Sequence, residues 1–294
     1  MIPRAIGIAG AGRVGQALAR LLREAGRPVA AVASRTIEHA REGAAFAGEG
    51  VAAVSYSELL AHASHLIIAV PDSAIEPVAE TLAAAARGGV ALHTCGARGP
   101  EALHALAAKG VACGALHPLQ TVSTPLQGVT ALRGIAFAIS GDEPALAWAR
   151  EIAALLEGET LAIAPGARPL YHAAAVMAGN YVVALADAAQ SLMVQAGVAP
   201  DQALRALAPL MRAAVENSVE QGPERALTGP IERGDAATVE SHVEALKTAP
   251  PALKSFYRAA GLCTLGIARR RGLDAARAQA VERALLSNCD LEGF

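Results

Sequence analysis

A glycine-rich turn near the start of the chain constrains the fold more than any other feature of the sequence. Residues 10–15 read Gly-Ala-Gly-Arg-Val-Gly, the GxGxxG pattern, between the apolar run of residues 5–9 and the amphipathic residues 14–25. The hexapeptide alone is weak evidence for a dinucleotide site, but between a strand and a helix there is a structural reason for each glycine. Gly10 permits the tight turn, Gly12 lets a pyrophosphate approach the backbone, and Gly15 lets helix and strand pack closely. An ordinary glycine turn is the alternative.

Apolar and amphipathic segments alternate through the first half of the chain. The predicted strands are residues 5–9, 29–33, 51–54, 66–70, 90–93, 111–116 and 135–139, and the predicted helices are residues 14–25, 37–46, 74–86 and 101–108. Continuous apolar strands between helices are typical of a parallel sheet covered on both faces. With right-handed crossovers, the sequence predicts an α/β fold with a doubly wound Rossmann sheet over residues 1–164.

After residue 165 the strand pattern stops. The predicted helices are residues 168–196, 200–221, 236–247, 251–271 and 275–287. Pro200 suits the first position of its helix, because proline lacks only an N–H that a helix start leaves free anyway. We therefore expect an all-α second domain over residues 165–294, with the boundary at Ala164-Pro165-Gly166.

Composition narrows the function classes. Hydrophobic residues make up 53% of the 294 residues and charged residues 18%, as in a globular protein, and a net charge of −2 argues against a nucleic-acid binder. The four cysteines form no CxxC pair, so we expect neither a zinc site nor a disulfide framework, which fits a reducing compartment.

Met1-Ile2-Pro3-Arg4 shows no signal-peptide pattern. The longest apolar stretch, residues 173–186, is broken by Asn180 and too short for a bilayer. We expect a cytoplasmic protein without metal, membrane or nucleic acid.

The end of the second predicted strand indicates which dinucleotide binds. NAD sites carry an acidic residue there for the ribose 2′-hydroxyl, whereas this chain has Ser34-Arg35-Thr36. A hydroxyl and a guanidinium suit a 2′-phosphate, because arginine offers a bidentate, charged grip. The sequence therefore favours NADP over NAD; a surface arginine at a helix start is the alternative.

Several motifs resemble a known family. With Val70-Pro71-Asp72 ending the fourth strand and a helical second half, the chain resembles the 6-phosphogluconate dehydrogenase-like superfamily. Closer similarity is to proteins that join a Rossmann-like domain to a DUF2520 domain. That similarity rests on Gly-Ala-Leu-His-Pro-Leu-Gln at residues 114–120, on Tyr171-His-Ala-Ala-Ala with Asn180-Tyr181, and on Thr-Gly-Pro-Ile-Glu-Arg-Gly-Asp at residues 228–235 with Thr238 and His242. The resemblance implies an NADP- or F420-dependent oxidoreductase and gives no substrate.

The predicted cofactor site combines these segments. Cys95 follows the fifth strand, near where a nicotinamide would lie. The full set is Gly10, Ala11, Gly12, Arg13, Val14, Gly15, Ser34, Arg35, Thr36, Val70, Pro71, Asp72 and Cys95.

His117 is the first candidate for acid–base chemistry. It follows a predicted strand, so its imidazole is expected at the carboxyl edge of the sheet, and His117-Pro118 is similar to the His-Pro-Met segment of prephenate dehydrogenases. An unperturbed histidine titrates near 6.5, which suits proton transfer. A histidine that caps the strand end by hydrogen bonding is the alternative.

Many β-hydroxyacid dehydrogenases place a lysine four residues before an asparagine; if Asn180 is that asparagine, the lysine position holds Val176.

Two further groups of polar residues are candidates for substrate contact. His172, Asn180 and Asp187 share a stripe of an otherwise apolar predicted helix, where they need either partners or a ligand. Arg233 precedes the helix that Asp235 is expected to cap, and it either binds a substrate anion or pairs with a neighbouring acid. We assign His117, His172, Asn180 and Arg233 as catalytic candidates.

The sequence thus predicts an NADP-dependent oxidoreductase that acts on a small polar metabolite in a cleft between its domains. A dinucleotide-binding sensor without turnover and an F420-dependent NADP oxidoreductase are the alternatives. Because the predicted helix of residues 168–196 is apolar around most of its circumference, we also expect a homodimer through the helical domain.

Overall fold

The computed structural model describes residues 5–287, which divide into two compact units, Met1–Val182 and Val183–Phe294. The expectation about Met1-Ile2-Pro3-Arg4 and the cysteine at position 289 lie outside the described residues. The change from strands to helices falls after residue 162, near the predicted boundary, but the compact units divide later, inside a helix.

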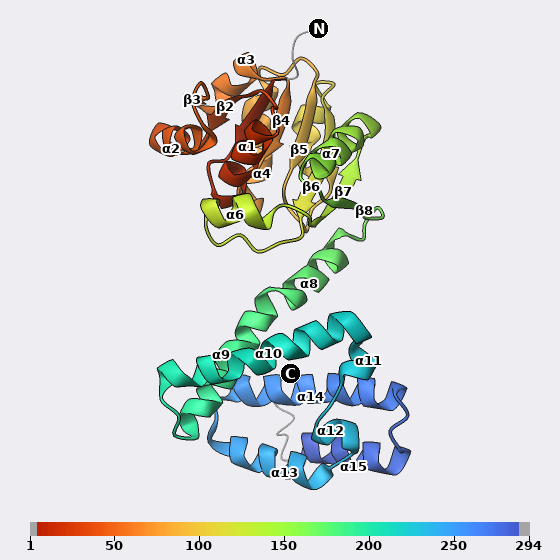
Figure 1. Ribbon diagram of the computed structural model, residues 1–294. Helices are drawn as coiled ribbons and strands as arrows, with labels where there is room; N and C mark the ends of the chain where they lie inside the picture. The colour runs from red at the N-terminus through yellow and green to blue at the C-terminus, as the bar shows by residue number, and fades with distance from the viewer. Residues whose placement is uncertain (1–4, 288–294) are drawn as a thin grey trace. The chain divides into compact units, whose positions relative to one another are not determined.

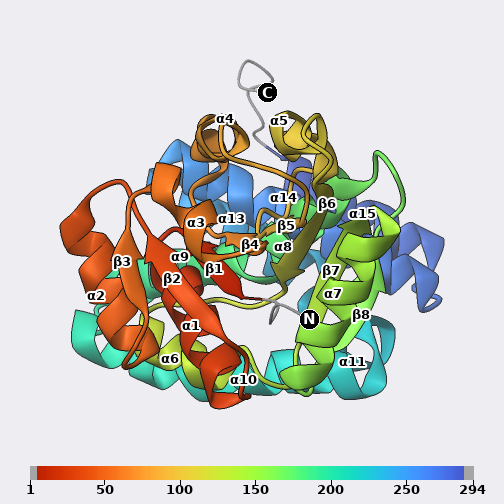
Figure 2. The same ribbon diagram turned by 90° about the horizontal axis from the view of Figure 1, so that it is seen from above.

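The first unit is built on one eight-stranded sheet (Figures 1 and 2). Its strand order is β3-β2-β1-β4-β5-β6-β7-β8, the order of a doubly wound sheet that reverses beside β1. The strands are β1 (Ile6–Ala9), β2 (Val29–Ala33), β3 (Ala52–Val54), β4 (His65–Ile68), β5 (Val90–His93), β6 (Ala112–Pro118), β7 (Ala136–Gly141) and β8 (Glu159–Ala162). The predicted α/β doubly wound fold is therefore confirmed.

One strand pair departs from the predicted all-parallel sheet. β7 runs antiparallel to β6, with His117 opposite Ala138, whereas the other strand pairs are parallel. The chain leaves β6 and enters β7 at the same end of the two strands, where Leu119 N donates to Ala136 O at 3.0 Å. A chain that makes no crossover must re-enter antiparallel. β8 was not predicted from the sequence.

Helices cover both faces of this sheet (Figure 2). The helical segments of the first unit are α1 (Arg13–Glu24), α2 (Ile37–Ala47), η1 (Tyr56–Glu58), α3 (Leu59–His62), η2 (Asp72–Ala74), α4 (Ile75–Ala83), η3 (Pro100–Leu103), α5 (His104–Ala107), α6 (Pro125–Ala131), α7 (Glu143–Leu155) and α8 (Arg168–Ala178). α1, α6 and α7 lie on one side, and α4 and α5 on the other. Because strand side chains alternate, Ile8 packs in one core and Ala9 in the other.

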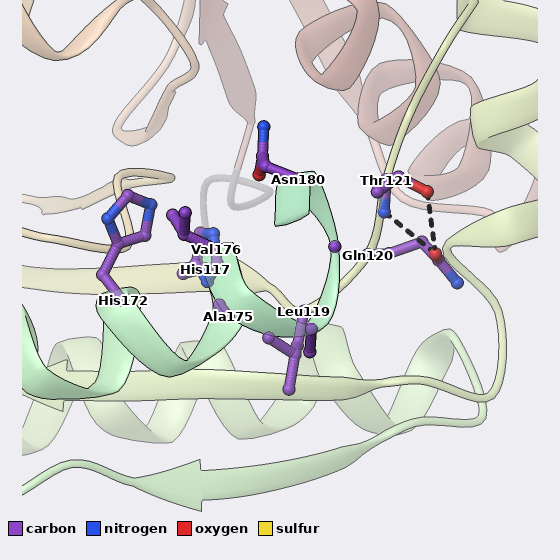
Figure 3. Close-up of a pocket in the computed structure, with 10 residues that line it drawn as sticks. His117, Leu119, Gln120, Thr121, His172, Ala175, Val176 and Asn180 are labelled. Atoms are coloured by element: carbon purple, nitrogen blue, oxygen red, sulfur yellow. Dashed lines mark hydrogen bonds between the residues drawn. The ribbon is translucent and has the colours of Figure 1, made fainter. Parts of the chain in front are cut away.

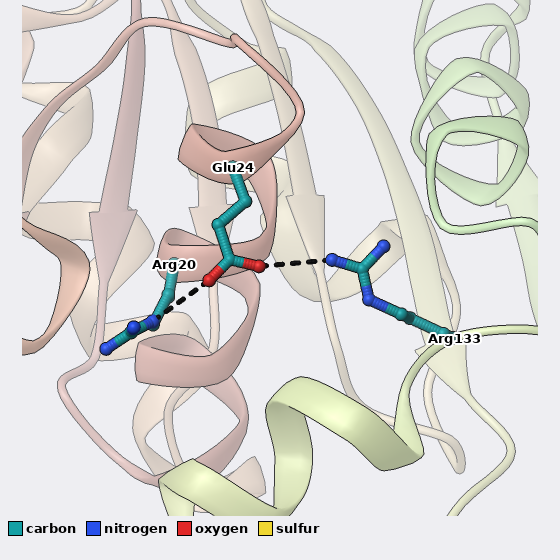
Figure 4. Close-up of polar contacts among 3 residues, drawn as sticks. All are labelled: Arg20, Glu24 and Arg133. Carbon is teal, nitrogen blue, oxygen red and sulfur yellow. Dashed lines mark hydrogen bonds and ion pairs between the residues drawn. The ribbon is translucent and has the colours of Figure 1, made fainter.

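Close approach and surface charge both join α1 to α6. A Cβ added at Gly128 of α6 would lie 2.8 Å from the Cβ of Ala17, so only glycine allows this helix spacing. Glu24 on α1 accepts from Arg20 and from Arg133, which follows α6, each at 3.1 Å (Figure 4). These ion pairs are exposed and stabilise little, so the apolar packing holds the two helices together.

The apolar run after residue 165 forms two helices rather than the predicted one. α8 ends at Ala178, Gly179 adopts φ −112° and ψ −75°, and α9 (Asn180–Gln195) follows. Glycine has a low helix propensity, which explains the break. By length and composition Arg168–Gln195 could cross a membrane: its mean hydropathy reaches 1.2, and none of that window is buried. This run is longer than the apolar stretch of residues 173–186; core helices of water-soluble proteins, which are mostly buried, meet the same criterion.

The second unit is helical in its described part. After α9 it contains α10 (Pro200–Gln221), α11 (Pro223–Ala226), α12 (Pro230–Arg233), α13 (Ala236–Ala245), η4 (Leu246–Thr248), α14 (Pro251–Arg270) and α15 (Ala275–Leu286). Its core lies between α13, α14 and α15, where Leu265 and Leu285 are fully buried. Asp235 caps α13 by accepting from Thr238 N at 3.1 Å, which confirms the predicted cap.

Candidate functional site

The glycine turn has the geometry that dinucleotide binding requires. Gly10 adopts φ +115°, and a Cβ there would collide with the carbonyl oxygen of Ala69. A Cβ at Gly15 would collide with Gly10, because α1 packs closely on β1. At Gly12 a Cβ would meet nothing within 4 Å. The fold therefore needs Gly10 and Gly15, whereas Gly12 faces open space that a ligand can use.

The N-terminus of α1 faces this open space. Gly12 is its N-cap residue and provides no side-chain cap, and the first turn carries no acidic residue. Uncapped N–H groups and the positive end of the helix dipole form an anion site. Ala11 and Val14 pack on the core, while Arg13 is exposed at the first position of the helix. These residues fit the pyrophosphate of a dinucleotide.

Ser34, Arg35 and Thr36 lie where β2 ends and α2 begins. Thr36 is the N-cap of α2, and its hydroxyl accepts from His39 N at 3.4 Å. Ser34 is half-buried and Arg35 is exposed. The hydroxyl and guanidinium predicted for a 2′-phosphate are therefore available at this strand end, while the Thr36 hydroxyl already serves the helix.

Two predicted cofactor residues meet at the next strand ends. Asp72 begins η2 after Val70 and Pro71, and Cys95 follows β5. Burial raises the pKa of the Cys95 thiol, and a hydrogen bond with Asp72 raises it further. Cys95 therefore stays a neutral thiol and is no nucleophile at neutral pH.

His93 at the end of β5 is structural. Its Nε2 lies 2.8 Å from Gly99 O, and its Nδ1 accepts from Cys95 N at 3.2 Å. Both bonds require a neutral imidazole with its proton on Nε2. Burial lowers the pKa of His93 to about 4, which keeps it neutral. His93 thereby holds the loop that carries Cys95.

His117 and α8 form one wall of a cavity of about 210 Å³ (Figure 3). The cavity is lined by His117, Leu119, Gln120, Thr121, His172, Ala175, Val176, Ala178, Gly179 and Asn180. Three of the four catalytic candidates, His117, His172 and Asn180, thus meet at one place, although they come from β6, from α8 and from the start of α9. Val176, four residues before Asn180, lines the same cavity.

His117 has a partner that sequence reasoning missed. Its Nδ1 lies 2.7 Å from the hydroxyl oxygen of Tyr171, the fourth residue of α8. The ring centroids of His117 and His172 are 6.0 Å apart. In the sequence Tyr171 stands out only as part of a motif, and no spacing rule connects it to a residue 54 positions earlier.

The charge state of His117 differs from the sequence expectation. Burial lowers its pKa to about 4, and the electrostatic influence of His172 and of the Arg168 guanidinium acts in the same direction. His117 is therefore neutral at pH 7, so an imidazolium does not supply the proton as a pKa near 6.5 implied. Burial likewise raises the pKa of Tyr171, which keeps its proton.

Arg168, at the start of α8, is a second residue that the sequence did not single out. It is 4% exposed, yet its guanidinium bonds only neutral oxygens: Ser140 Oγ at 3.1 Å, and Cys95 O and Ala138 O at 3.2 Å. These bonds fasten α8 to β7 and to the Cys95 loop. A buried cation held by neutral groups leaves its charge to act on its neighbours, here Tyr171 and His117.

Arg233 and Asp187 belong to the second unit and do not line this cavity. Arg233 is exposed and lines a different cavity, of about 450 Å³, with Arg271 and Arg277. His242 pairs with the hydroxyl of Tyr257 at 2.8 Å. Within residues 5–287, no group of three or more His, Cys, Asp or Glu side chains has a metal-binding arrangement.

Comparison with known proteins identifies two domains in the sequence. Residues 3–118 match the Rossmann-like domain, and residues 135–264 match the domain of unknown function DUF2520. The DUF2520 match begins at β7, earlier than the predicted boundary at residue 165, and so includes the last two strands of the sheet. No curated protein matches the chain.

Solved structures share the fold. A protein from Thermotoga maritima is 24% identical with a TM-score of 0.71, covering 90% of this chain and 100% of its own. A protein from Bacteroides fragilis, provisionally designated an NADP oxidoreductase, is 23% identical with a TM-score of 0.70, covering 91% and 99%. A reductive aminase from Aspergillus terreus, in complex with NADPH and ethyl-5-oxohexanoate, is 20% identical with a TM-score of 0.57, covering 96% and 92%.

Proposed function

The chain is a protein that joins a Rossmann-like domain to a DUF2520 domain, and we propose that it is an NADPH-dependent reductase of a small polar substrate. The observation that carries the proposal is the open space at Gly12 against the uncapped start of α1, together with Ser34 and Arg35 at the end of β2. The NADP(H) named for the structural relatives supports the same cofactor.

Different residues of this chain would bind the cofactor and the substrate. The N–H groups at the start of α1 bind the pyrophosphate, and Arg35 binds the 2′-phosphate. When bound, the nicotinamide supplies a hydride. The cavity beside His117 holds the substrate, and the exposed amide of Asn180 orients its polar group.

The proton would come from the His117–Tyr171 pair. Because His117 is neutral, its Nε2–H donates to the substrate heteroatom while Nδ1 takes the phenol proton of Tyr171 across their 2.7 Å contact. The phenolate left on Tyr171 would be stabilised by the charge of Arg168 until water returns the proton. The substrate thus gains one hydride and one proton, and the imidazole ends neutral.

Cofactor binding tests the first half of the proposal. Titration of the full chain with NADPH and NADH should give at least about tenfold tighter binding of NADPH, equivalent to ~1.4 kcal/mol. Arg35→Ala should remove most of that difference, while Arg41→Ala, on the outer face of α2, should not. Equal affinities for the two dinucleotides in the unmodified protein would reject NADP preference.

Turnover tests the second half. NADPH oxidation is followed with small ketones, 2-oxo acids and ketone–amine mixtures, chosen after a thermal-shift screen in the presence of NADPH, because ligands of the native state raise the Tm. A reductase consumes NADPH with at least one substrate class and loses this activity in His117→Ala. Tight NADPH binding without turnover across the panel would favour a dinucleotide-binding sensor instead.

A further inference from the structure

Tyr56 lies at the end of the strand next to β2, and nothing in the sequence patterns pointed to it. β2 and β3 are paired with Ala33 opposite Val54, so the residues that follow, Ser34-Arg35 and Ser55-Tyr56, leave the sheet side by side. Parallel strands end at the same edge, where ligands of such sheets bind. Tyr56 therefore starts beside the proposed 2′-phosphate site.

The position of Tyr56 beside that site is restricted by both its ring and its backbone. The ring is partly buried and packs on the core that contains Val54 and Leu59. Its backbone is fixed because Ser55 forms a capping box with Glu58, in which Ser55 N donates to the carboxylate at 2.9 Å. The ring is therefore held at the start of η1, next to the end of β2.

Two groups of the 2′-phosphate site act on the Tyr56 hydroxyl. The Ser34 hydroxyl and the Arg35 charge both lie close enough to the Tyr56 hydroxyl to lower its pKa. Burial outweighs both and raises the pKa of Tyr56, so the phenol keeps its proton at neutral pH. A protonated phenol can donate a hydrogen bond to a phosphate oxygen.

We propose that Tyr56 is a specificity-determining residue, which together with Ser34 and Arg35 forms a three-sided site for the 2′-phosphate of NADPH. The inference rests on the proposed function. Arg35 supplies charge from an exposed, flexible side chain, whereas Ser34 and Tyr56 supply hydroxyl donors from half-buried positions. A hydrogen bond to a charged group contributes more than one between neutral groups, so removing the phenol hydroxyl alone should be measurable.

The experiment uses calorimetric titration of the full chain with adenosine 2′,5′-bisphosphate and with AMP, which differ only in the 2′-phosphate. Tyr56→Phe keeps the ring and its packing. We expect it to weaken binding of the bisphosphate about tenfold and to leave AMP binding unchanged. Ser57→Ala, which removes an exposed hydroxyl from the same turn, should change neither affinity.

Each other outcome overturns the inference in a distinguishable way. If Tyr56→Phe weakens both ligands equally, the residue acts on adenosine or on the fold; if it weakens neither, the phenol does not contact the phosphate. If the unmodified chain binds the bisphosphate no better than AMP, the NADP preference itself is wrong. If Arg35→Ala abolishes the preference while Tyr56→Phe leaves it intact, NADP specificity stands and only the role of Tyr56 fails.

Discussion

The Nδ1 atom of His117 lies 2.7 Å from the phenol oxygen of Tyr171, and this contact joins the end of a sheet strand to the first turn of α8. Neither residue is charged at neutral pH, since burial lowers the pKa of His117 to about 4 and raises that of Tyr171. The pair can therefore pass a proton without holding a charge between turnovers. Arg168, buried in the same turn, supplies the nearby positive charge.

Removing the imidazole should stop proton transfer. We expect His117→Ala to lower kcat by ~10²–10⁴ and to leave the Kd for NADPH nearly unchanged, because the imidazole lines the cavity beside α8 and not the glycine turn. Tyr171→Phe should lower kcat by a similar factor, ~10²–10⁴, because the neutral imidazole can release its Nε2 proton only while Nδ1 takes the phenol proton. Steady-state kinetics with the identified substrate and NADPH titrations measure both effects.

A second tyrosine–histidine pair provides the control. Tyr257 and His242 have nearly the same contact, 2.8 Å, in the second unit, so Tyr257→Phe removes an equivalent hydrogen bond outside the proposed machinery and should keep full kcat. Full activity of His117→Ala would remove this residue from the mechanism. An inflection of kcat/KM near pH 6.5 that disappears in that variant would instead contradict the neutral-imidazole step, since it would mean that His117 takes part with an ordinary pKa.

Two glycines of the turn should respond oppositely to alanine. Gly12→Ala should fold with nearly unchanged stability, because its Cβ meets nothing within 4 Å, yet it should weaken NADPH binding by at least about tenfold by occupying the space of the pyrophosphate. Gly10→Ala should destabilise the fold itself, since φ +115° and the Ala69 carbonyl exclude a side chain. Urea unfolding and NADPH titration of both variants separate the effects; tight binding by Gly12→Ala would place the pyrophosphate elsewhere.

Acid should destabilise the first unit through His93. Its pKa is near 6.5 in an unfolded chain and about 4 when folded, so between these values the unfolded chain binds a proton that the native state does not. The stabilising contribution is complete above about pH 6.5, declines by up to ~1.4 kcal/mol per pH unit below it, and is lost below about pH 4. His117 contributes in the same direction.

The pH dependence of urea unfolding measures this effect. His93→Gln keeps a donor for Gly99 O but does not titrate, so its free energy of unfolding should fall less steeply between about pH 7 and pH 5. His104→Gln, at an exposed position on α5, serves as the control and should keep the slope of the unmodified protein. Equal slopes in all three proteins would mean that His93 is protonated in the folded chain.

Assembly follows from the exposed apolar side chains of α8 and α9. Met177 is 63% exposed and Val183 is 70% exposed, and none of the most apolar window of this run is buried. Apolar surface of this extent needs cover, and an isologous twofold interface is the commonest form. We expect a homodimer with a buried interface of roughly 2,000 Å² or more.

Light scattering at low micromolar concentration decides the question, since one chain has a mass of 29.8 kDa. Val183→Glu should shift the mass toward that of a monomer, whereas Glu220→Gln, an exposed change on α10, should not. A monomeric mass for the unmodified chain would reject the dimer. Co-sedimentation of the chain with lipid vesicles would instead show that Arg168–Gln195 binds a membrane.

The sequence alone determined the elements whose causes are local. The glycine turn, the doubly wound sheet, the Asp235 cap and the helix from Pro200 follow from turn geometry, side-chain periodicity and capping, each read within a few neighbouring residues. Exposed residues at strand ends, such as Arg35, could be identified in the same way. The break at Gly179 and the strand β8 were missed, because a single glycine and a short exposed strand carry weak local signals.

Only the tertiary structure decided which distant residues meet and how they ionise. Tyr171 reaches His117, and Tyr56 reaches Ser34, because α8 packs beside β6 and because β2 and β3 end at one edge. The burial that lowers the pKa of His117 depends on every group around it, including the Arg168 guanidinium from another element. Local patterns specify secondary structure; desolvation and contact between distant segments arise only after the chain has folded, and they set the chemistry of the site.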